Sequence, residues 1–164
     1  MENSLQKIHG LLKKFDTAML VTHGRDYIEH ARPMGIAHID DNCDVWFFTE
    51  RASEKAREIH HDSAVLLVFQ KDHSAYVSIT GQAQLTTDKS KTAEIWKDSF
   101  KTWFPGGVND PNLLLIRVIV QEAEYWDNTG FKGIKYLFEA AKARSQGTKP
   151  HVDEPEQHGK VNLK

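Results

Sequence analysis

The sequence predicts an antiparallel β-barrel with flanking helices, a fold that is mainly β in its core and α+β by census. Two observations favour it over a doubly wound parallel sheet. Most of the predicted strands are joined by short turns, and few helices lie between them to act as crossovers. One segment alternates apolar and polar residues strictly, which is typical of a sheet with one buried face. The length of 164 residues corresponds to one globular unit.

The first part of the chain is predicted to form a helix followed by three strands. Apolar residues recur at helical spacing over residues 5–15, which indicates an amphipathic helix. Strands are expected at residues 18–22, 32–39 and 45–49, and in the last of these every residue is β-branched or aromatic. Residues 40–44 are polar, so the second and third strands are expected to form a hairpin around this turn.

A second helix and two further strands are predicted next. Ser53 is expected to cap a helix over residues 54–60, since a serine at this position can accept a bond from a free backbone N–H. Residues 65–69 are apolar on both faces, which indicates a strand covered by a helix or by a second subunit. Residues 75–85 carry the clearest alternation, with small and apolar side chains on one face and Ser, Thr and Gln on the other.

A third helix is expected to begin after Asp88, which can cap its first turn. Trp96, Phe100 and Trp103 would lie along one side of this helix. The Phe-Pro-Gly-Gly segment at 104–107 ends it, because proline and paired glycines stop helices.

The remaining segments define the end of the folded unit. A long strand is expected at residues 113–126 and a last helix at residues 133–145. Few apolar residues follow. The sequence therefore predicts one domain at 1–146 and a polar, disordered tail at 147–164.

Charge and composition exclude several classes of protein. Lys and Arg number 21 and Asp and Glu 23, so the surplus of cations that nucleic-acid binding requires is absent. No apolar run reaches the ~20 residues that span a bilayer, and residues 1–7 are too polar for a secretory signal. The single cysteine, Cys43, cannot form an internal disulfide, which indicates a cytoplasmic protein. The acidic residues beside it are expected to raise the pKa of its thiol.

The junction between the strand at 45–49 and the next helix offers a site for an anion. Free backbone N–H groups and the helix dipole favour a phosphate there. Ser53 can donate a hydrogen bond, and Lys55 supplies a positive charge. Arg32 opens the strand that is expected to pair with residues 45–49, so its guanidinium can reach the same phosphate. The alternative is a capped helix with two ordinary surface cations.

Aromatic residues are more numerous than a small core requires, and flat rings make good walls for a planar heterocycle. Trp46 and Trp96 are expected to pack in the core. The Trp-Phe-Pro-Gly-Gly turn at 103–107 suits either the rim of a pocket or a subunit contact.

No metal site is expected from motif spacing. Residues 40–44 imitate the start of a calcium-binding loop, but Val45 replaces the required glycine and Arg51 stands where the bidentate glutamate should be. His60 and His61 would point about 100° apart on a helix, which makes them poor joint ligands.

Several segments together carry a resemblance to a known family. In the first half they are Arg-Pro-Met-Gly at 32–35, Trp-Phe-Phe-Thr at 46–49, Ser-Glu-Lys-Ala at 53–56 and the apolar strand at 64–69; later segments lie at 76–83, 103–107 and 125–127. Their order and spacing resemble the pyridoxamine 5′-phosphate oxidase-like FMN-binding split barrels, and most of all the general stress protein branch. The resemblance runs from about the first helix to Asp127.

What this resemblance implies is a six-stranded antiparallel split β-barrel that forms a homodimer, with FMN in clefts at the subunit interface. The residues matching the family's phosphate ligands are Arg32, Ser53 and Lys55. The residues expected to line the flavin ring are Pro33, Met34, Gly35, Phe48 and Thr49. The partner subunit is expected to close the ring side, and the candidates for this contact are Tyr76 and Trp103.

The resemblance also implies a function: a redox or general-stress flavoprotein, with FMN-dependent oxidoreductase activity on a small molecule. Tyr76 stands where the oxidases commonly have glutamine, and Glu54 replaces a frequent basic residue. Residues 130–150 lack an equivalent of the Arg/His motif that binds pyridoxal phosphate, so vitamin B6 oxidation is not expected. No catalytic acid or base is identified. The alternatives are a non-enzymatic flavin-binding stress or sensor protein, and a split barrel that uses deazaflavin or haem.

Overall fold

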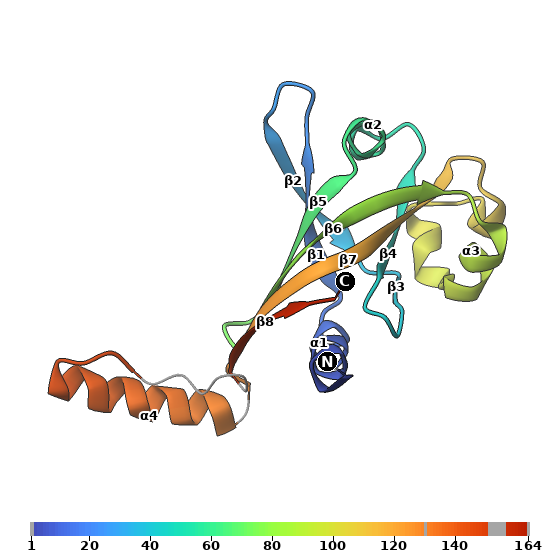
Figure 1. Ribbon diagram of the computed structural model, residues 1–164. Coiled ribbons are helices and arrows are strands. Elements are labelled where there is room, and N and C mark those ends of the chain that lie inside the picture. The colour runs from blue at the N-terminus through green and yellow to red at the C-terminus, as the bar shows by residue number, and fades with distance from the viewer. Residues whose placement is uncertain (1, 130, 151–156, 164) are drawn as a thin grey trace.

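The chain folds into a curled antiparallel sheet with helices on its flanks, as the computed structural model shows for residues 2–129, 131–150 and 157–163 (Figure 1). The strand order is β2-β1-β5-β6-β7-β4-β3, and β8 lies beside β7. The strands are β1 (Thr17–His23), β2 (Glu29–Gly35), β3 (His38–Ile39), β4 (Val45–Glu50), β5 (Ala64–Lys71), β6 (Ala75–Thr86), β7 (Leu113–Asp127) and β8 (His158–Asn162). The helices are α1 (Glu2–Leu12), α2 (Glu54–His61), α3 (Lys89–Ile95) and α4 (Phe131–Gln146), and two 3₁₀ turns are η1 (Asp98–Thr102) and η2 (Gly107–Asn109).

The curl of the sheet makes a barrel. It brings β2, at one end of the strand order, into contact with β4 near the other end. Within the described ranges, β3 has two residues and β8 has five, whereas the other six strands are longer. The predicted mainly β fold, an antiparallel split barrel with flanking helices, is confirmed, but the described residues form a sheet of eight strands where six were expected.

Alternation along the strands builds the inner face of the barrel. On β6, Val77, Ile79 and Ala83 are buried, whereas Thr80 and Gln84 are exposed, as the sequence predicted. The predicted amphipathic helix also packs on this core, because Ile8 of α1 is fully buried within it.

Strand β4 is buried on both faces, which is unusual for a sheet strand outside a layered fold. Val45 and Phe47 point into the barrel core. Trp46 and Phe48 point the opposite way, into a second apolar cluster that includes Ile95 of α3. This strand therefore joins the barrel to the helical segment beside it.

The turn of the β3–β4 hairpin is fixed to β7 by a buried carboxylate. One oxygen of Asp44, a residue only 2% exposed, accepts bonds from Arg117 Nε at 2.9 Å and Nη2 at 2.7 Å. The other oxygen accepts from Val120 N at 3.2 Å. Burial, with the Asp44 charge, raises the pKa of the neighbouring Cys43 thiol to about 11, so this cysteine stays protonated. The predicted hairpin is present, with its turn tied into the sheet.

One predicted strand is divided in two. Residues 32–39 were expected to form one strand paired with β4, but β2 ends at Gly35 and pairs with β1, where Arg32 lies opposite Leu20. Only β3 pairs with β4. Ile36 N still donates to Asp16 O, whereas the next amide donates to Trp46 O, so the chain changes partners at a corner of the barrel. The expectation that Arg32 lies on a strand paired with β4 is wrong.

The third predicted helix is shorter than expected. Asp88 caps α3 by accepting a bond from Lys91 N at 3.0 Å, as predicted. However, α3 ends at Ile95, and Trp96 has extended backbone before η1 begins. The break allows the rings of Trp96 and Phe100 to converge on Phe48, so tertiary packing overrides the helical spacing here.

The C-terminal part of the chain is partly ordered by backbone pairing. The predicted last helix is present as α4, which extends away from the barrel (Figure 1). Residues 158–162 were expected to be an unpaired tail, but they form β8 along β7, and Val161 packs against the core. Residues 151–156 of the predicted tail lie outside the described residues. None of the helices that the structure describes combines the length and apolarity needed to cross a membrane.

Candidate functional site

The junction between β4 and α2 places a hydroxyl pair and an ammonium group together. Ser53 caps α2, because its side chain accepts a bond from Ala56 N at 3.4 Å. Its Oγ also lies 3.1 Å from Thr49 Oγ1 at the end of β4. Lys55 Nζ donates to the same threonine oxygen at 3.2 Å. The cap that the sequence predicted is confirmed, and it orients the first turn of α2 toward these groups.

We expect Ser53→Ala to lower the free energy of unfolding by about 1 kcal/mol, because α2 would lose its cap. Urea unfolding followed by circular dichroism measures this change. Ser90→Ala, on an exposed position of α3, is the matched control and should change stability by less than about 0.5 kcal/mol. Equal effects of the two substitutions would contradict the role of Ser53.

Arg32 reaches this junction from β2. Its guanidinium donates to Thr22 Oγ1 of β1 and, at 2.9 Å, to Oε2 of Glu58 on α2. Lys55 carries a like charge close by: burial lowers the pKa of Lys55, and the positive charge of Arg32 lowers it further. In the part of the chain that the structure describes, Lys55 Nζ has a hydroxyl partner and no carboxylate within ion-pair distance. The two cations therefore lie close enough to repel each other, and of the pair it is Arg32 that has a carboxylate partner, Glu58.

A pocket of about 390 Å³ lies between these cations and a group of aromatic side chains. It is lined by Arg32, Pro33, Met34, Gly35, Phe48, Thr49, Glu50, Lys55, Phe100, Trp103 and Phe104. We call Arg32, Thr49 and Lys55 the cationic end of this pocket. We call Phe48, Phe100, Trp103 and Phe104 its aromatic wall.

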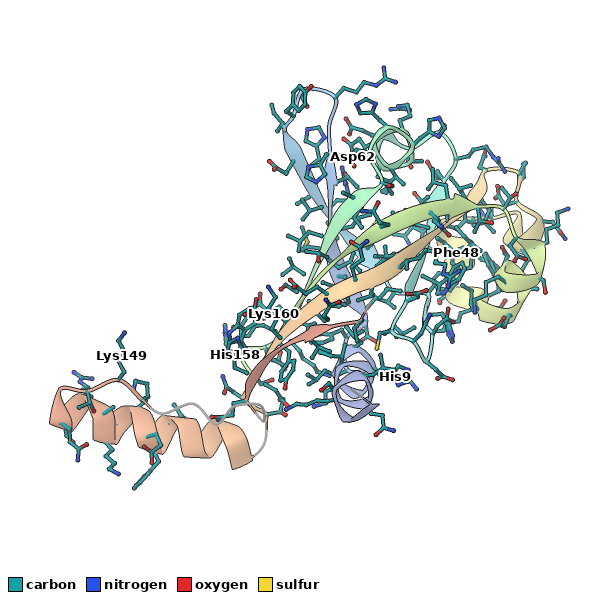
Figure 2. The ribbon with its side chains drawn as sticks, viewed as in Figure 1. His9, Phe48, Asp62, Lys149, His158 and Lys160 are labelled. Carbon is teal, nitrogen blue, oxygen red and sulfur yellow. The ribbon has the colours of Figure 1, made fainter. Side chains whose placement is uncertain are left out.

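The aromatic wall is built around one ring. Phe48 packs edge-on against Phe100, with ring centroids 4.8 Å apart, and against Phe104 at 6.3 Å. Phe48 lies between the barrel and the α3 segment (Figure 2). Trp103 stands at the rim and is 73% exposed. The wall thus offers apolar contact to a flat ligand, with one large ring left free to cover it.

Most of the residues singled out from the sequence meet in this pocket. Ser53 does not line it but is hydrogen-bonded to Thr49, which does. Tyr76 is elsewhere: it is half-buried on β6, opposite Gln70 of β5 and Trp126 of β7.

Sequence reasoning missed the carboxylate behind the cationic end. Glu58 is 6% exposed, and besides Arg32 it accepts a bond from Thr22 Oγ1 at 2.5 Å and contacts His30 Nδ1. Burial alone would raise the pKa of Glu58, but the bonds from Thr22, His30 and Arg32 outweigh burial and lower it. We call Thr22, His30, Arg32 and Glu58 the Glu58 cluster. Its one signal in the sequence was a charged residue next to Ile59, on the face of α2 that points inward.

His30, Glu54 and Glu58 also bring three metal-ligand atoms within 4.8 Å of one another. Motif spacing in the sequence does not reveal this group, because His30 lies on a strand and the two glutamates lie on a helix that is distant in sequence. The Glu58 oxygens are already engaged by Thr22, His30 and Arg32. The arrangement is therefore that of an ion-pair network.

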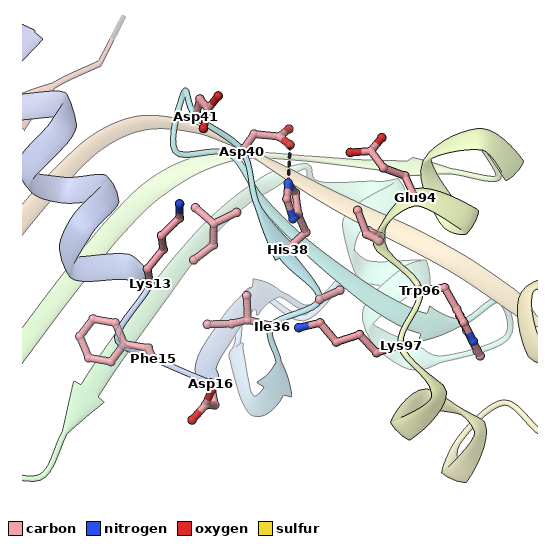
Figure 3. A pocket seen from close by; sticks show the side chains of 13 residues that line it. Lys13, Phe15, Asp16, Ile36, His38, Asp40, Asp41, Glu94, Trp96 and Lys97 are labelled. Atoms are coloured by element: carbon pink, nitrogen blue, oxygen red, sulfur yellow. Dashed lines mark ion pairs between the residues drawn. The ribbon is translucent and has the colours of Figure 1, made fainter.

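A second cavity, of about 620 Å³, contains none of the predicted site residues. It lies between the end of α1, β3 and the end of α3 (Figure 3). His38 Nε2 pairs with Asp40 Oδ1 at 3.2 Å inside it, and Lys13 and Lys97 stand on opposite walls. Charges of both signs are mixed around this cavity, so it does not select an anion as the cationic end does.

Comparison with known families now assigns the fold. The family model of pyridoxamine 5′-phosphate oxidase-like proteins matches residues 3–151. The chain belongs to this family. The predicted family is thereby confirmed, including its general stress protein branch, since a solved structure that is 30% identical to this chain over 79% of its length carries that description. A comparison with curated protein sequences finds no match.

Two solved members illustrate the range of the pyridoxamine 5′-phosphate oxidase-like family. A general stress protein 26 from Jannaschia sp. CCS1 is 24% identical and superimposes with a TM-score of 0.77 over 99% of both chains. The general stress FMN/FAD binding protein from Xanthomonas citri is 30% identical, with a TM-score of 0.68 over 79% of this chain and 92% of the other. The first shows the shared fold over almost the whole length. The second is a family member described as a flavin binder.

Proposed function

We propose that the chain binds FMN in the pocket between the cationic end and the aromatic wall. The observation that carries this proposal is the pair of neighbouring cations, Arg32 and Lys55, at one end of a pocket whose other end is aromatic. FMN has the matching asymmetry, because a phosphate dianion and a flat ring system lie at its two ends. The description of the Xanthomonas citri relative as an FMN/FAD binding protein supports the same ligand class.

The cationic end fits a phosphate. Two like charges near each other in a half-buried site repel, and an anion placed between them removes that cost. Arg32 and Lys55 would donate charge-assisted hydrogen bonds, and Ser53 would add its hydroxyl. Backbone N–H groups at the start of α2 would add to this attraction, as helix N-termini favour anions.

The other end fits the ring. The residues from Pro33 to Gly35 border the pocket, and Phe48, Phe100 and Phe104 give it an apolar side. FMN supplies the electron-transfer chemistry when it is bound, and the protein orients the ring and limits its contact with water. We propose an oxidoreductase of the redox or general-stress type, acting in the cytoplasm on a small molecule. Vitamin B6 oxidation is not part of the proposal.

We further propose that the protein is a homodimer in which the partner covers the ring. Met19 of β1 and Val68 of β5 lie opposite each other and are 38% and 37% exposed, which leaves an apolar area on the outer sheet face. Tyr76 lies on this same outer face, since its strand neighbour Gln70 is on the exposed side of β5. Tyr76 and Trp103 are our candidates for contacts across such an interface.

Val68→Asp is expected to shift the protein to monomers, because a charge at the centre of an apolar interface is costly to desolvate. Light scattering coupled to size exclusion measures the mass. FMN affinity should fall with it, by at least about tenfold, if the partner closes the ring side. Ile28→Asp, at an exposed apolar residue of the β1–β2 loop outside this area, is the control for a charge alone. A monomeric wild-type protein with full FMN affinity would refute the dimer proposal.

The first experiment is native mass spectrometry of the purified protein with its visible spectrum. We expect the mass of a dimer carrying FMN and flavin absorption in the blue and near ultraviolet. A colourless protein that takes up no added FMN would refute the proposed function. The mass of a bound deazaflavin, or a Soret band from haem, would show that the protein uses that cofactor and not FMN. Reduction of the bound flavin by NADH or NADPH, followed by turnover with an acceptor, separates an enzyme from a non-enzymatic flavin binder.

A further inference from the structure

The Glu58 cluster lies behind the cationic end and shares Arg32 with it. Glu58 does not line the FMN pocket but borders a neighbouring cavity of about 420 Å³, together with His30. Its carboxylate is the only buried acid within the described residues that pairs with a predicted phosphate ligand. A buried negative charge beside a phosphate site weakens phosphate binding unless something compensates for it.

We propose that Glu58 is a positioning residue for Arg32 and that His30 switches the charge Glu58 presents to the phosphate. With His30 neutral, the Glu58 carboxylate offsets the charge of Arg32. With His30 protonated, the imidazolium neutralises Glu58, and the full positive charge of Arg32 and Lys55 acts on the ligand. FMN therefore binds more tightly to the protonated form. This inference rests on the proposed FMN site.

The geometry lets Arg32 serve both partners at once. A guanidinium has five N–H donors in a plane. Arg32 Nη1 donates to Thr22 Oγ1 and Nη2 to Glu58 Oε2, while the same side chain also lines the FMN pocket. The cluster thus holds one edge of the guanidinium and leaves the remaining donors for an anion. Thr22 is fully buried and supports the arrangement by donating to Glu58 and accepting from Arg32.

His30 is placed to titrate in this cluster. Its Nδ1 contacts Glu58 Oε1, and its side chain is 35% exposed, so it can exchange protons with solvent. The hydrogen bond with Glu58 raises the pKa of His30, against a smaller opposing effect of desolvation. The other charged groups around it and around Glu58 come from the β1–β2 loop, from β4 and from α2: Arg25, Asp26, Glu50, Glu54, Lys55 and Arg57.

The expected size of the effect follows from Coulomb's law. A unit charge several ångströms from a phosphate in a half-buried site changes its affinity about tenfold. The phosphate of FMN itself takes up a proton near pH 6, which weakens binding at low pH. That effect belongs to the ligand and is common to all variants, so differences between variants isolate the contribution of the protein.

The test is FMN binding by fluorescence quenching from about pH 5.5 to 8.5 for the wild type, His30→Gln and Glu58→Gln. Relative to His30→Gln, the wild type should gain about tenfold in affinity as pH falls through the pKa of His30. Glu58→Gln keeps an oxygen that can accept from Arg32 and so preserves its position, but it loses the negative charge. It should therefore bind FMN about tenfold more tightly than the wild type at the alkaline end, with no such gain on acidification. Riboflavin, which lacks the phosphate, should show none of these differences.

A second measurement does not depend on flavin. NMR titration of the His30 ring in the free protein should give a lower pKa in Glu58→Gln than in the wild type. A purely structural Glu58 would instead make Glu58→Gln bind FMN more weakly at every pH. Parallel pH profiles in the three proteins, or an unchanged His30 pKa, overturn this inference while FMN binding stands. If the wild type binds no FMN at any pH, both proposals fail.

Discussion

Replacing both cations of the pocket, in the double variant Arg32→Ala/Lys55→Ala, is expected to abolish FMN binding at micromolar concentrations. Each side chain would contribute a charge-assisted hydrogen bond worth roughly 1.5–3 kcal/mol. Because Arg32 and Lys55 share one small pocket, their contributions are coupled, and we expect a combined loss of about 3–5 kcal/mol. This corresponds to a fall in affinity of at least about a hundredfold. Isothermal titration with FMN measures it.

The control variant must remove one Lys charge and one Arg charge at positions far from the pocket. Lys142 and Arg144 are exposed on α4, away from the barrel, so Lys142→Ala/Arg144→Ala changes the net charge equally. This variant should bind FMN within about twofold of the wild type, because charges farther away than a Debye length are screened. If the Arg32 and Lys55 substitutions leave affinity at the level of the control, the phosphate assignment is wrong.

The second large effect concerns stability. Arg117→Met would leave the Asp44 carboxylate buried without its guanidinium partner, since Asp44 is 2% exposed and both Arg117 bonds end on its Oδ2. Breaking a buried ion pair from one side costs about 3–5 kcal/mol. We expect a loss near the lower value, because Arg117 is 35% exposed and Val120 N still donates to Asp44. The midpoint of thermal unfolding should fall by about 10 °C.

Removing both charges separates the buried carboxylate from other effects of the substitution. The double variant Asp44→Asn/Arg117→Met should be more stable than Arg117→Met alone, by about 1 kcal/mol or more, because no unpaired charge is left in the core. Calorimetry of the wild type, Asp44→Asn, Arg117→Met and the double variant gives the coupling energy. Additive losses would show that the hairpin turn is held by packing and not by this ion pair.

The parts of the fold that the sequence predicted are those with local signals. The alternation on β6 and the caps at Ser53 and Asp88 each depend on neighbours within a few residues, so they can be read without the fold. The cations and the aromatic residues of the pocket were also identified, since a charge or a ring at the end of an element is visible in the sequence.

The missed features depend on contacts between distant segments. The corner at Ile36 exists because one amide bonds to Asp16 and the next to Trp46, and neither partner is close in sequence. Strand β8 is polar and is recruited by the free edge of β7, which composition cannot reveal. Glu58 belongs to no sequence motif, and its role depends on β1 and β2, which place Thr22 and Arg32 around it.

The two-sided burial of β4 has a consequence for protein engineering. Its odd-numbered residues Val45 and Phe47 pack in the barrel interior, whereas Trp46 and Phe48 pack in the apolar cluster beside the pocket. A library restricted to the even positions could reshape the wall for bulkier or differently substituted ring systems while the scaffold keeps its own packing. Because side chains alternate along the strand, the residues that stabilise the barrel and the residues that shape the ligand pocket are different ones, and each set can be varied without the other.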